Sequence, residues 1–160
     1  MTERFETKMS IIDAEIERLG LPFVKFEYRR SFTRQHLLFL KGREIRAGSA
    51  VVVDQSKVVT RARPGQSAHN WGFAVDYVLV VKHAWWDGEL APRGPWDDGR
   101  GRPLVPLTWD RLGRLADQVD LEWGGRWKFL DRPHIQVRKW ENLRPKDWRE
   151  IAQREITAGR

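Results

Sequence analysis

The sequence contains no cysteine among its 160 residues. Disulfide bonds, cysteine-ligated zinc and thiol nucleophiles are therefore excluded, so any metal site must be built from histidine and carboxylate side chains. Long apolar runs are also missing, and none approaches the roughly 20 residues that a membrane-spanning helix needs. The hydrophobic content of 41% is still enough for a packed core. We expect a single globular domain over residues 1–160, because a chain of this length can fold without metal or disulfide support.

Acidic residues are in short supply. The chain has 22 Asp and Glu against 29 Lys and Arg, which gives a net charge of +7. The excess lies in residues 21–70, with ten basic and three acidic residues, and in residues 138–160, with seven and four. A basic surface favours polyanions, and nucleic acid, anionic lipid and an anionic cell-wall polymer all remain open on this evidence. Simple solubility is the other interpretation of the charge.

The N-terminus lacks the features of an export signal. Residues 1–20 carry five acidic residues and no uninterrupted apolar stretch, so we expect synthesis in the cytoplasm without a signal peptide. The apolar residues of this segment recur at spacings of four and three, which predicts an amphipathic helix that Gly20 and Pro22 end. The residues of its apolar face are Phe5, Met9, Ile12, Ile16 and Leu19.

Helices and strands are interspersed along the rest of the chain. The predicted strands are Phe23–Tyr28, Gly72–Val81 and His134–Val137, with Ala50–Val53 and Lys57–Thr60 as a hairpin or as a loop and strand. The predicted helices are Thr33–Lys41 closed by Gly42, the stripe Trp109, Leu112, Leu115 and Val119 capped by Thr108, and Pro145–Ile156. The strand connections are too irregular for repeated βαβ units. The fold class is therefore α+β, with a small, mainly antiparallel sheet flanked by helices.

One long loop interrupts this pattern. Residues 84–106 are rich in tryptophan, proline, glycine and aspartate. Loops of this length inside a domain are mostly functional or disordered. Trp85, Trp86 and Trp96 favour order, so we expect a flap beside a binding cleft.

Two histidines and a carboxylate are candidate metal ligands. His69 lies on the segment that enters a predicted strand, and Asp76 occupies an otherwise apolar part of that strand. A hydrogen-bonded His–Asp pair is the simpler interpretation, but a carboxylate there is costly to bury unless it is paired or coordinated. His134 begins another strand after Pro133. Two histidines and one carboxylate leave a fourth zinc position open to water, as in catalytic zinc sites.

Asp131 precedes His134 by three residues, which would place it beside that water as a general base. A carboxylate that caps the turn before the strand is the alternative role. The other histidines, His36 and His83, have no ligand partner at a useful spacing, and we expect both to be structural.

Together the motifs resemble the zinc D-Ala-D-Ala carboxypeptidase and L-alanyl-D-glutamate endopeptidase family, which has a hedgehog/DD-peptidase-like fold and includes the peptidoglycan-cutting endolysins of phages. The matching segments are Ser67-Ala68-His69 with Gly72, Ala74 and Asp76, then Trp123-Gly124-Gly125-Arg126-Trp127, Asp131-Arg132-Pro133-His134, and Arg30-Ser31 followed by Gln35, Leu38, Gly42 and Arg43. Phe39 stands where the family has tyrosine. The resemblance covers about residues 25–137. Separated motifs in the right order are far more specific than any one of them.

The resemblance also implies roles for individual residues. The implied ligands of one zinc ion per chain are His69, Asp76 and His134. Asp131 is implied as the base that later donates a proton to the leaving amine. Arg30 is implied to hold the substrate carbonyl or carboxylate, and Arg29 could replace it if the strand register is shifted by one. Many carboxypeptidase members have glutamate at the position of Asp131, so aspartate makes this chain more similar to the phage endopeptidases.

Four further side chains near these motifs are expected to contact the substrate: Ser67, Trp71, Glu122 and Trp127. Glu122 is also a rival for the role of base. Scattered tryptophans are otherwise mostly core residues, but Trp71 and Trp127 flank the proposed ligands and can form the wall of a cleft.

The sequence thus predicts a zinc peptidase that cleaves peptidoglycan stem peptides, at the L-Ala-D-Glu bond. We expect a monomeric phage-type endolysin that acts on the cell wall after release during host lysis, with the basic surface attracted to an anionic envelope. The alternatives are a D-Ala-D-Ala carboxypeptidase of the same mechanism and a noncatalytic basic binding protein. Nucleic-acid binding would not require this set of histidines and aspartates, so we expect no specific nucleic-acid partner.

Overall fold

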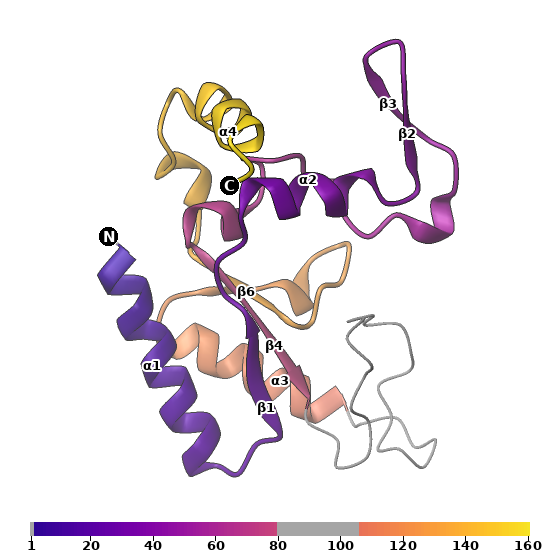
Figure 1. Cartoon of the computed structure of the whole chain (residues 1–160). Helices are drawn as coiled ribbons and strands as arrows, with labels where there is room; N and C mark the ends of the chain where they lie inside the picture. Colours follow the sequence, from indigo (N-terminus) through magenta and orange to yellow (C-terminus); the bar gives the residue numbers. More distant parts are fainter. Residues whose placement is uncertain (1, 80–105) are drawn as a thin grey trace. The chain divides into compact units, whose positions relative to one another are not determined.

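The computed structural model describes residues 2–79 and 106–160 (Figure 1). The chain divides into two compact units: unit 1 comprises residues 1–26 and 75–138, and unit 2 comprises residues 27–74 and 139–160. The loop predicted over residues 84–106 lies outside the described residues apart from its last residue, and so does His83. The prediction of a single domain stays a prediction.

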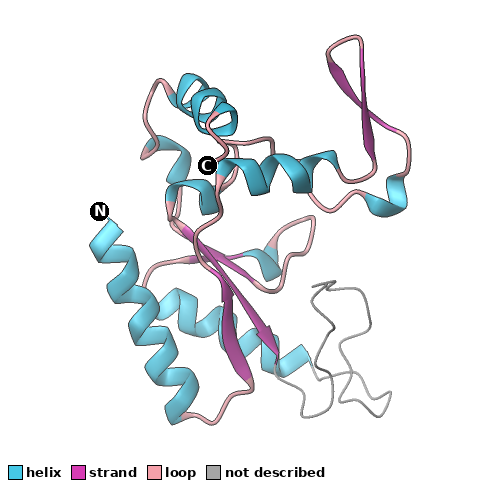
Figure 2. Ribbon diagram, viewed as in Figure 1, coloured by secondary structure: helices cyan, strands magenta, loops and turns pink. Residues whose placement is uncertain are grey.

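A four-stranded sheet and two helices make up unit 1. The strands, in spatial order, are β1 (Phe23–Glu27), β4 (Ala74–Leu79), β6 (His134–Gln136) and β5 (Glu122–Trp123). The helices are α1 (Thr2–Arg18) and α3 (Pro106–Gln118), and a 3-10 turn, η3 (Gly124–Arg126), follows β5. Strands β1 and β4 each extend one residue into unit 2. The α+β class with a small sheet is confirmed, and Figure 2 shows the mixture of helices and strands.

The sheet of unit 1 has two chemically different faces. Alternate residues of a strand point to opposite sides. Tyr77, Trp123 and Ile135 are buried toward the helices, where the Tyr77 hydroxyl donates to Asp13 of α1 and the Trp123 ring lies against Gly113 of α3. The alternation therefore places a polar set on the opposite face: Asp76, Glu122, His134 and Gln136.

Helix α1 confirms most of its predicted apolar face. Four of the five predicted residues are at most 6% exposed: Phe5, Met9, Ile12 and Ile16. Leu19 is 42% exposed, because the helix ends at Arg18 and Gly20 turns the chain with a φ of 60°. The Leu21 N–H then donates to the Ile16 carbonyl, as in a Schellman motif. The predicted stripe was thus one residue too long.

Helix α3 begins earlier than predicted. Thr108 was expected to cap the helix, but α3 already begins at Pro106, so Thr108 lies inside the first turn. Proline suits the first position of a helix because its missing N–H would have no partner there. The predicted buried stripe is otherwise confirmed for Trp109, Leu112 and Leu115. No helix among the described residues combines the length and the apolarity needed to cross a bilayer.

Unit 2 contains two helices, a hairpin and several short turns. Helices α2 (Phe32–Leu40) and α4 (Trp148–Thr157) contact each other. The 3-10 turns are η1 (Gln55–Lys57), η2 (Ala68–Trp71) and η4 (Trp140–Asn142). Ser31 caps α2, since its hydroxyl accepts a hydrogen bond of 3.1 Å from the Arg34 N–H.

The hairpin of unit 2 differs from the predicted one. Strand β3 (Ser49–Val52) pairs with β2 (Arg43–Arg46), which lies upstream, so the predicted strand Lys57–Thr60 is wrong. Ala47 and Gly48 form the turn with φ values of 49° and 77°. Both values are positive, as a type I′ turn requires, but alanine is unusual there and hides the turn in the sequence.

Two other predicted boundaries are displaced by two or three residues. Helix α4 begins at Trp148 and not at Pro145, whose carbonyl accepts from the Trp148 N–H at 3.2 Å. Strand β4 begins at Ala74, because Gly72 adopts a left-handed conformation that ends η2. Glycine tolerates this conformation at little cost, and the turn separates His69 from the strand that carries Asp76.

Candidate functional site

Asp76 and His134 lie together on the polar face of the sheet in unit 1. Their strands β4 and β6 are neighbours, and the Tyr77 N–H donates to the Pro133 carbonyl at 2.9 Å. His134 Nδ1 is 3.1 Å from Asp76 Oδ1, and His134 is only 7% exposed. Two of the three predicted metal ligands are therefore adjacent within one unit.

The surroundings of His134 favour positive charge. Burial lowers the pKa of His134, because it disfavours the charged ring. The hydrogen bond and negative charge of Asp76, the charge of Asp131 and the hydrogen bond to Gln136 outweigh burial, so the pKa lies above its usual value. The same negative potential would stabilise a metal cation held by the ring nitrogen and the carboxylate.

Asp131 is held near His134 by a tight loop. The Asp131 N–H donates to the Gly124 carbonyl at 3.0 Å, and the His134 N–H donates to the Asp131 carbonyl at 3.1 Å. A Cβ atom on Gly124 would overlap the Asp131 carbonyl oxygen, so this closure needs glycine. The Asp131 residue is exposed, and its charge acts on His134. The backbone turn is present, and the role of base stays a prediction.

The Trp123 side chain holds the loop that contains Asp131 in place. Cβ atoms on Gly113 and on Gly125 would overlap the Trp123 ring, so the ring lies close against both glycines. Its indole N–H donates to the Arg132 carbonyl at 2.7 Å, and the residue is 5% exposed. The Trp-Gly-Gly motif is therefore explained by packing, which fixes the segment that leads to His134.

A chain of hydrogen bonds runs behind His134. Glu122 accepts from the Trp127 indole N–H at 2.7 Å and from the Gln136 amide at 3.2 Å. The Gln136 Oε1 atom lies 2.9 Å from His134 Nε2. Sequence reasoning missed Gln136, although its position two residues after His134 on one strand puts both side chains on the same face.

His69 is held rigidly in unit 2, on η2. Its Nδ1 lies 3.0 Å from the Tyr28 carbonyl oxygen, and its own carbonyl accepts from the Arg30 N–H at 3.1 Å. A carbonyl oxygen can only accept, so Nδ1 carries the proton and the Nε2 atom carries the lone pair. His69 is 2% exposed and precedes Asp76 by seven residues.

Residues on either side of His69 reinforce its position. The Asn70 amide donates to the Arg30 carbonyl at 3.0 Å and accepts from the Gly65 N–H at 2.9 Å. The Trp71 indole donates to the Gly65 carbonyl at 3.1 Å, and its ring packs edge-on against Phe32 at 5.3 Å. Ser67 stands at the start of η2 without a side-chain capping bond. These contacts are structural, and contact of Ser67 and Trp71 with substrate stays a prediction.

Arg30 is tied into a small ion-pair network. Its guanidinium donates to Glu27 through Nε at 2.8 Å and through Nη2, and to Gln35 Oε1 at 2.8 Å. Arg34 donates to the other Glu27 oxygen at 2.7 Å. Burial raises the pKa of Glu27, but the hydrogen bonds and charges of Arg30 and Arg34 outweigh it and hold that pKa below its usual value. Arg29, by contrast, is exposed.

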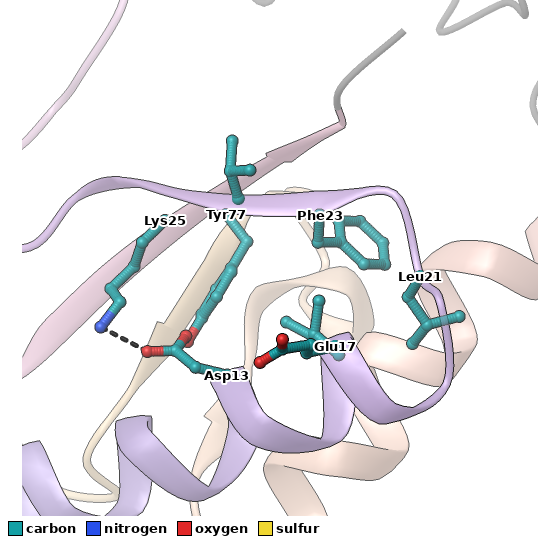
Figure 3. Close-up of a pocket in the computed structure, with 8 residues that line it drawn as sticks. Asp13, Glu17, Leu21, Phe23, Lys25 and Tyr77 are labelled. Atoms are coloured by element: carbon teal, nitrogen blue, oxygen red, sulfur yellow. Dashed lines mark hydrogen bonds and ion pairs between the residues drawn. The ribbon is translucent and has the colours of Figure 1, made fainter.

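A separate hollow of about 320 Å³ lies on the helix side of unit 1 (Figure 3). Lys25 Nζ pairs with Asp13 at 2.5 Å, and the Tyr77 hydroxyl donates to the same carboxylate at 2.7 Å. Burial and Asp13 raise the pKa of Tyr77. Because Tyr77 and Asp76 alternate along β4, the hollow is on the opposite face of the sheet from His134.

Comparison with known proteins shows which peptidase family this chain is similar to. The profile of a family described as D-alanyl-D-alanine carboxypeptidase matches residues 60–137, the range that holds Asp76, Asp131 and His134. This match and the relative described next confirm the resemblance to this peptidase family that the motifs predicted.

One relative gives a more particular comparison. The chain is 33% identical over 120 residues to the peptidoglycan L-alanyl-D-glutamate endopeptidase CwlK of Bacillus subtilis. The match covers 74% of this chain and 62% of CwlK, so this chain spans less than two thirds of that protein.

Two solved structures are similar to the present chain. The LdcB LD-carboxypeptidase has a TM-score of 0.52 at 16% identity, with 94% of this chain and 69% of that chain covered. The DacB structure of Streptococcus pneumoniae has a TM-score of 0.49 at 17% identity, with 95% and 71% covered. At this identity the similarity to LdcB shows a shared fold.

Proposed function

We propose that this chain is a zinc-dependent peptidoglycan peptidase that cleaves stem peptides, at the L-Ala-D-Glu bond. The observation that carries the proposal is the contact between half-buried Asp76 and buried His134, in a chain that is 33% identical over 120 residues to an L-alanyl-D-glutamate endopeptidase. A half-buried carboxylate beside a buried imidazole is costly, and a bound cation would offset that cost.

The chemistry of the side chains fits zinc. His69, Asp76 and His134 offer two imidazole nitrogens and one carboxylate oxygen, the ligand set of catalytic zinc sites that keep one position for water. We include His69 because its Nδ1 proton is committed to the Tyr28 carbonyl, which leaves the lone pair at Nε2. The chemistry that a bound zinc ion supplies is polarisation of a carbonyl group and a pKa of about 7 for coordinated water.

The remaining roles belong to residues of the chain itself. We propose that Asp131 accepts a proton from the attacking water and returns it to the leaving amine. Arg30 is proposed to bind the substrate carbonyl or carboxylate, with Arg29 as the alternative. Ser67 and Trp71 are proposed to contact the stem peptide. The Glu122 carboxylate accepts hydrogen bonds from the Trp127 indole and from Gln136, which supports a role in positioning His134.

The biological setting is also a proposal. We propose a monomeric phage-type endolysin that reaches the cell wall after release during host lysis. The net charge of +7, concentrated in residues 21–70, supports attraction to an anionic envelope.

Metal content and product masses test the proposed activity together. We expect one zinc per chain in the purified protein, and digestion of a defined peptidoglycan should yield products cut after L-Ala. The His134→Ala variant should lose both zinc and wall hydrolysis. A folded protein without stoichiometric zinc, whose His134→Ala variant digests walls as well as wild type, would instead support a noncatalytic binding protein.

A D-Ala-D-Ala carboxypeptidase of the same mechanism is the second candidate. The description of the matching family profile favours it. The same digestion separates the two, because a carboxypeptidase releases free terminal D-Ala and leaves the bond after L-Ala intact. That product pattern would reject the endopeptidase proposal.

A further inference from the structure

Four polar side chains of unit 1 form one continuous line on the face of the sheet opposite the helices. The line runs from the Trp127 indole to Glu122, from Glu122 to Gln136, and from Gln136 to His134, with separations of 2.7, 3.2 and 2.9 Å. The other ring nitrogen of His134 faces Asp76 at 3.1 Å.

The direction of every bond in this line follows from Glu122, because an ionised carboxylate can only accept hydrogen bonds. An indole N–H can only donate, so the Glu122 carboxylate accepts from Trp127. The carboxylate also accepts from its second neighbour, which turns the NH₂ group of Gln136 toward Glu122. The Gln136 oxygen then faces His134, so His134 Nε2 must carry a proton and donate it.

A proton at Nε2 determines which nitrogen of the neutral His134 ring has a lone pair for a metal. In the neutral ring the lone pair is then at Nδ1, the atom beside Asp76. We propose that Trp127, Glu122 and Gln136 are positioning residues, which hold the Nε2 proton of His134 and so direct its Nδ1 lone pair to the metal. This inference rests on the proposed function, because it assumes that a metal binds at Asp76 and His134.

The sheet explains why the line is continuous. Strands β5 and β6 are antiparallel, with Glu122 directly opposite Gln136. Directly opposed side chains on one face of a sheet lie close enough to interact. His134 precedes Gln136 by two residues and shares its face. Both are at most 9% exposed, and polar groups at that depth are stable only when they are hydrogen-bonded.

The Glu122→Gln variant tests the direction of the hydrogen bonds, because glutamine has nearly the same size and shape as glutamate. The Trp127 N–H would still donate to the new amide oxygen, so the new NH₂ group would face Gln136. Gln136 would then rotate and present its own NH₂ group to His134 Nε2. The ring would have to place its proton on Nδ1, where it would block the metal. We expect a 10- to 100-fold weaker zinc affinity, measured by competition with a chelator, as is typical for lost partners of metal-bound histidines.

The double variant Glu122→Gln/Gln136→Glu should reverse this loss. The carboxylate at position 136 accepts hydrogen bonds from His134 Nε2 and from the amide at position 122. The Nε2 proton of His134 is therefore kept, as in wild type. Two-bond ¹H–¹⁵N correlation spectra of the zinc-bound protein give a second readout, which should show the metal at Nδ1 and the proton at Nε2 of His134 in wild type and in the double variant. Glu141→Gln, which removes an exposed carboxylate in unit 2, is the matched control and should change neither readout.

The possible results distinguish a failure of the proposed function from a failure of the inference about His134. Wild type that binds no zinc overturns the proposed function itself. Wild type that binds zinc through Nε2 of His134, or a folded Glu122→Gln variant with unchanged affinity, overturns the inference alone. If circular dichroism shows that Glu122→Gln does not fold, Trp127→Phe replaces it. That variant keeps the carboxylate as acceptor, so zinc should still bind through Nδ1, and binding through Nε2 would contradict the proposal.

Discussion

Asp131 has a structural contact and a proposed catalytic role, and a single substitution can separate the two. Its backbone closes the loop at Gly124 and supports His134, whereas only its carboxylate can move a proton. A side-chain change that preserves the backbone should therefore affect chemistry and leave metal binding intact.

We expect Asp131→Asn to keep one zinc per chain and to lower kcat by about 10²- to 10⁴-fold, the usual contribution of a positioned general base. Zinc analysis and hydrolysis of a defined stem peptide measure both quantities. Asp147→Asn is the control, because Asp147 is exposed and makes no capping hydrogen bond at the start of α4. Loss of zinc in Asp131→Asn would mean that Asp131 is a ligand and that the assignment is wrong.

In Arg30, the same side chain has structural contacts and a proposed role with substrate. The Arg30 and Glu27 side chains are only 12% and 11% exposed. We expect Arg30→Ala to lower the free energy of unfolding by about 2 kcal/mol, because the Glu27 carboxylate loses charged hydrogen bonds. It should also lower kcat/KM by about 100- to 1000-fold, as for loss of an oxyanion-stabilising donor.

The neighbouring arginine separates these effects. Arg29→Ala should leave urea denaturation unchanged within about 0.5 kcal/mol, since Arg29 is exposed. It should also leave kcat/KM unchanged. If Arg29→Ala lost activity while Arg30→Ala lost only stability, Arg29 would be the substrate arginine.

At the level of elements, the contact between α3 and β5 depends on a glycine. Alanine normally stabilises a helix by about 1 kcal/mol relative to glycine. In Gly113→Ala, however, the new Cβ would overlap the Trp123 ring. Overpacking in a core costs about 1–3 kcal/mol, so we expect a net destabilisation of about 1 kcal/mol in thermal or urea unfolding.

A second substitution on the same helix controls for general effects. Arg111 lies on the exposed side of α3, and Arg111→Ala should change stability by less than about 0.5 kcal/mol. A Gly113→Ala protein that melts at or above the wild-type temperature would show that the Trp123 ring can move away from α3 without cost.

The elements also show how far sequence reasoning extends. Periodicity predicted the buried face of α1, and the alternation along β4 was visible in its apolar residues. Asp76 and His134 could be singled out because their motifs are local, and the structure brings their side chains within 3.1 Å of each other, whereas their role as metal ligands stays a prediction. Gln136 was missed although it lies two residues after His134 on the same strand. The contact of Glu122 with Gln136 could not be found, because it depends on the register of β5 and β6, strands of two and three residues. The β2–β3 turn was missed because Ala47 is an uncommon residue in its conformation.

At the level of the whole molecule, metal binding should be visible as stability. A ligand that binds only the folded state at 100 times its Kd stabilises it by about 2.7 kcal/mol. For a chain of this size, 1 kcal/mol corresponds to a Tm shift of about 2–4 °C. We therefore expect zinc to raise the Tm of the chelator-treated protein by about 5–10 °C. His134→Ala should show no such shift, and an equal shift in that variant would place the zinc elsewhere.

The distribution of positive charge should affect how strongly the protein binds to cell walls. With +7 overall and most of the excess in residues 21–70, attraction to an anionic wall would be a long-range effect. Salt screens such effects, since the Debye length falls from about 10 Å at 0.1 M to about 3 Å at 1 M. We expect binding to isolated cell walls to weaken steadily over this range, as measured by sedimentation. Hydrolysis of a short soluble stem peptide should change little, because its reaction depends on contacts within the site. If both fell in parallel, salt would be acting on the site and the basic surface would have no separate role in reaching the wall.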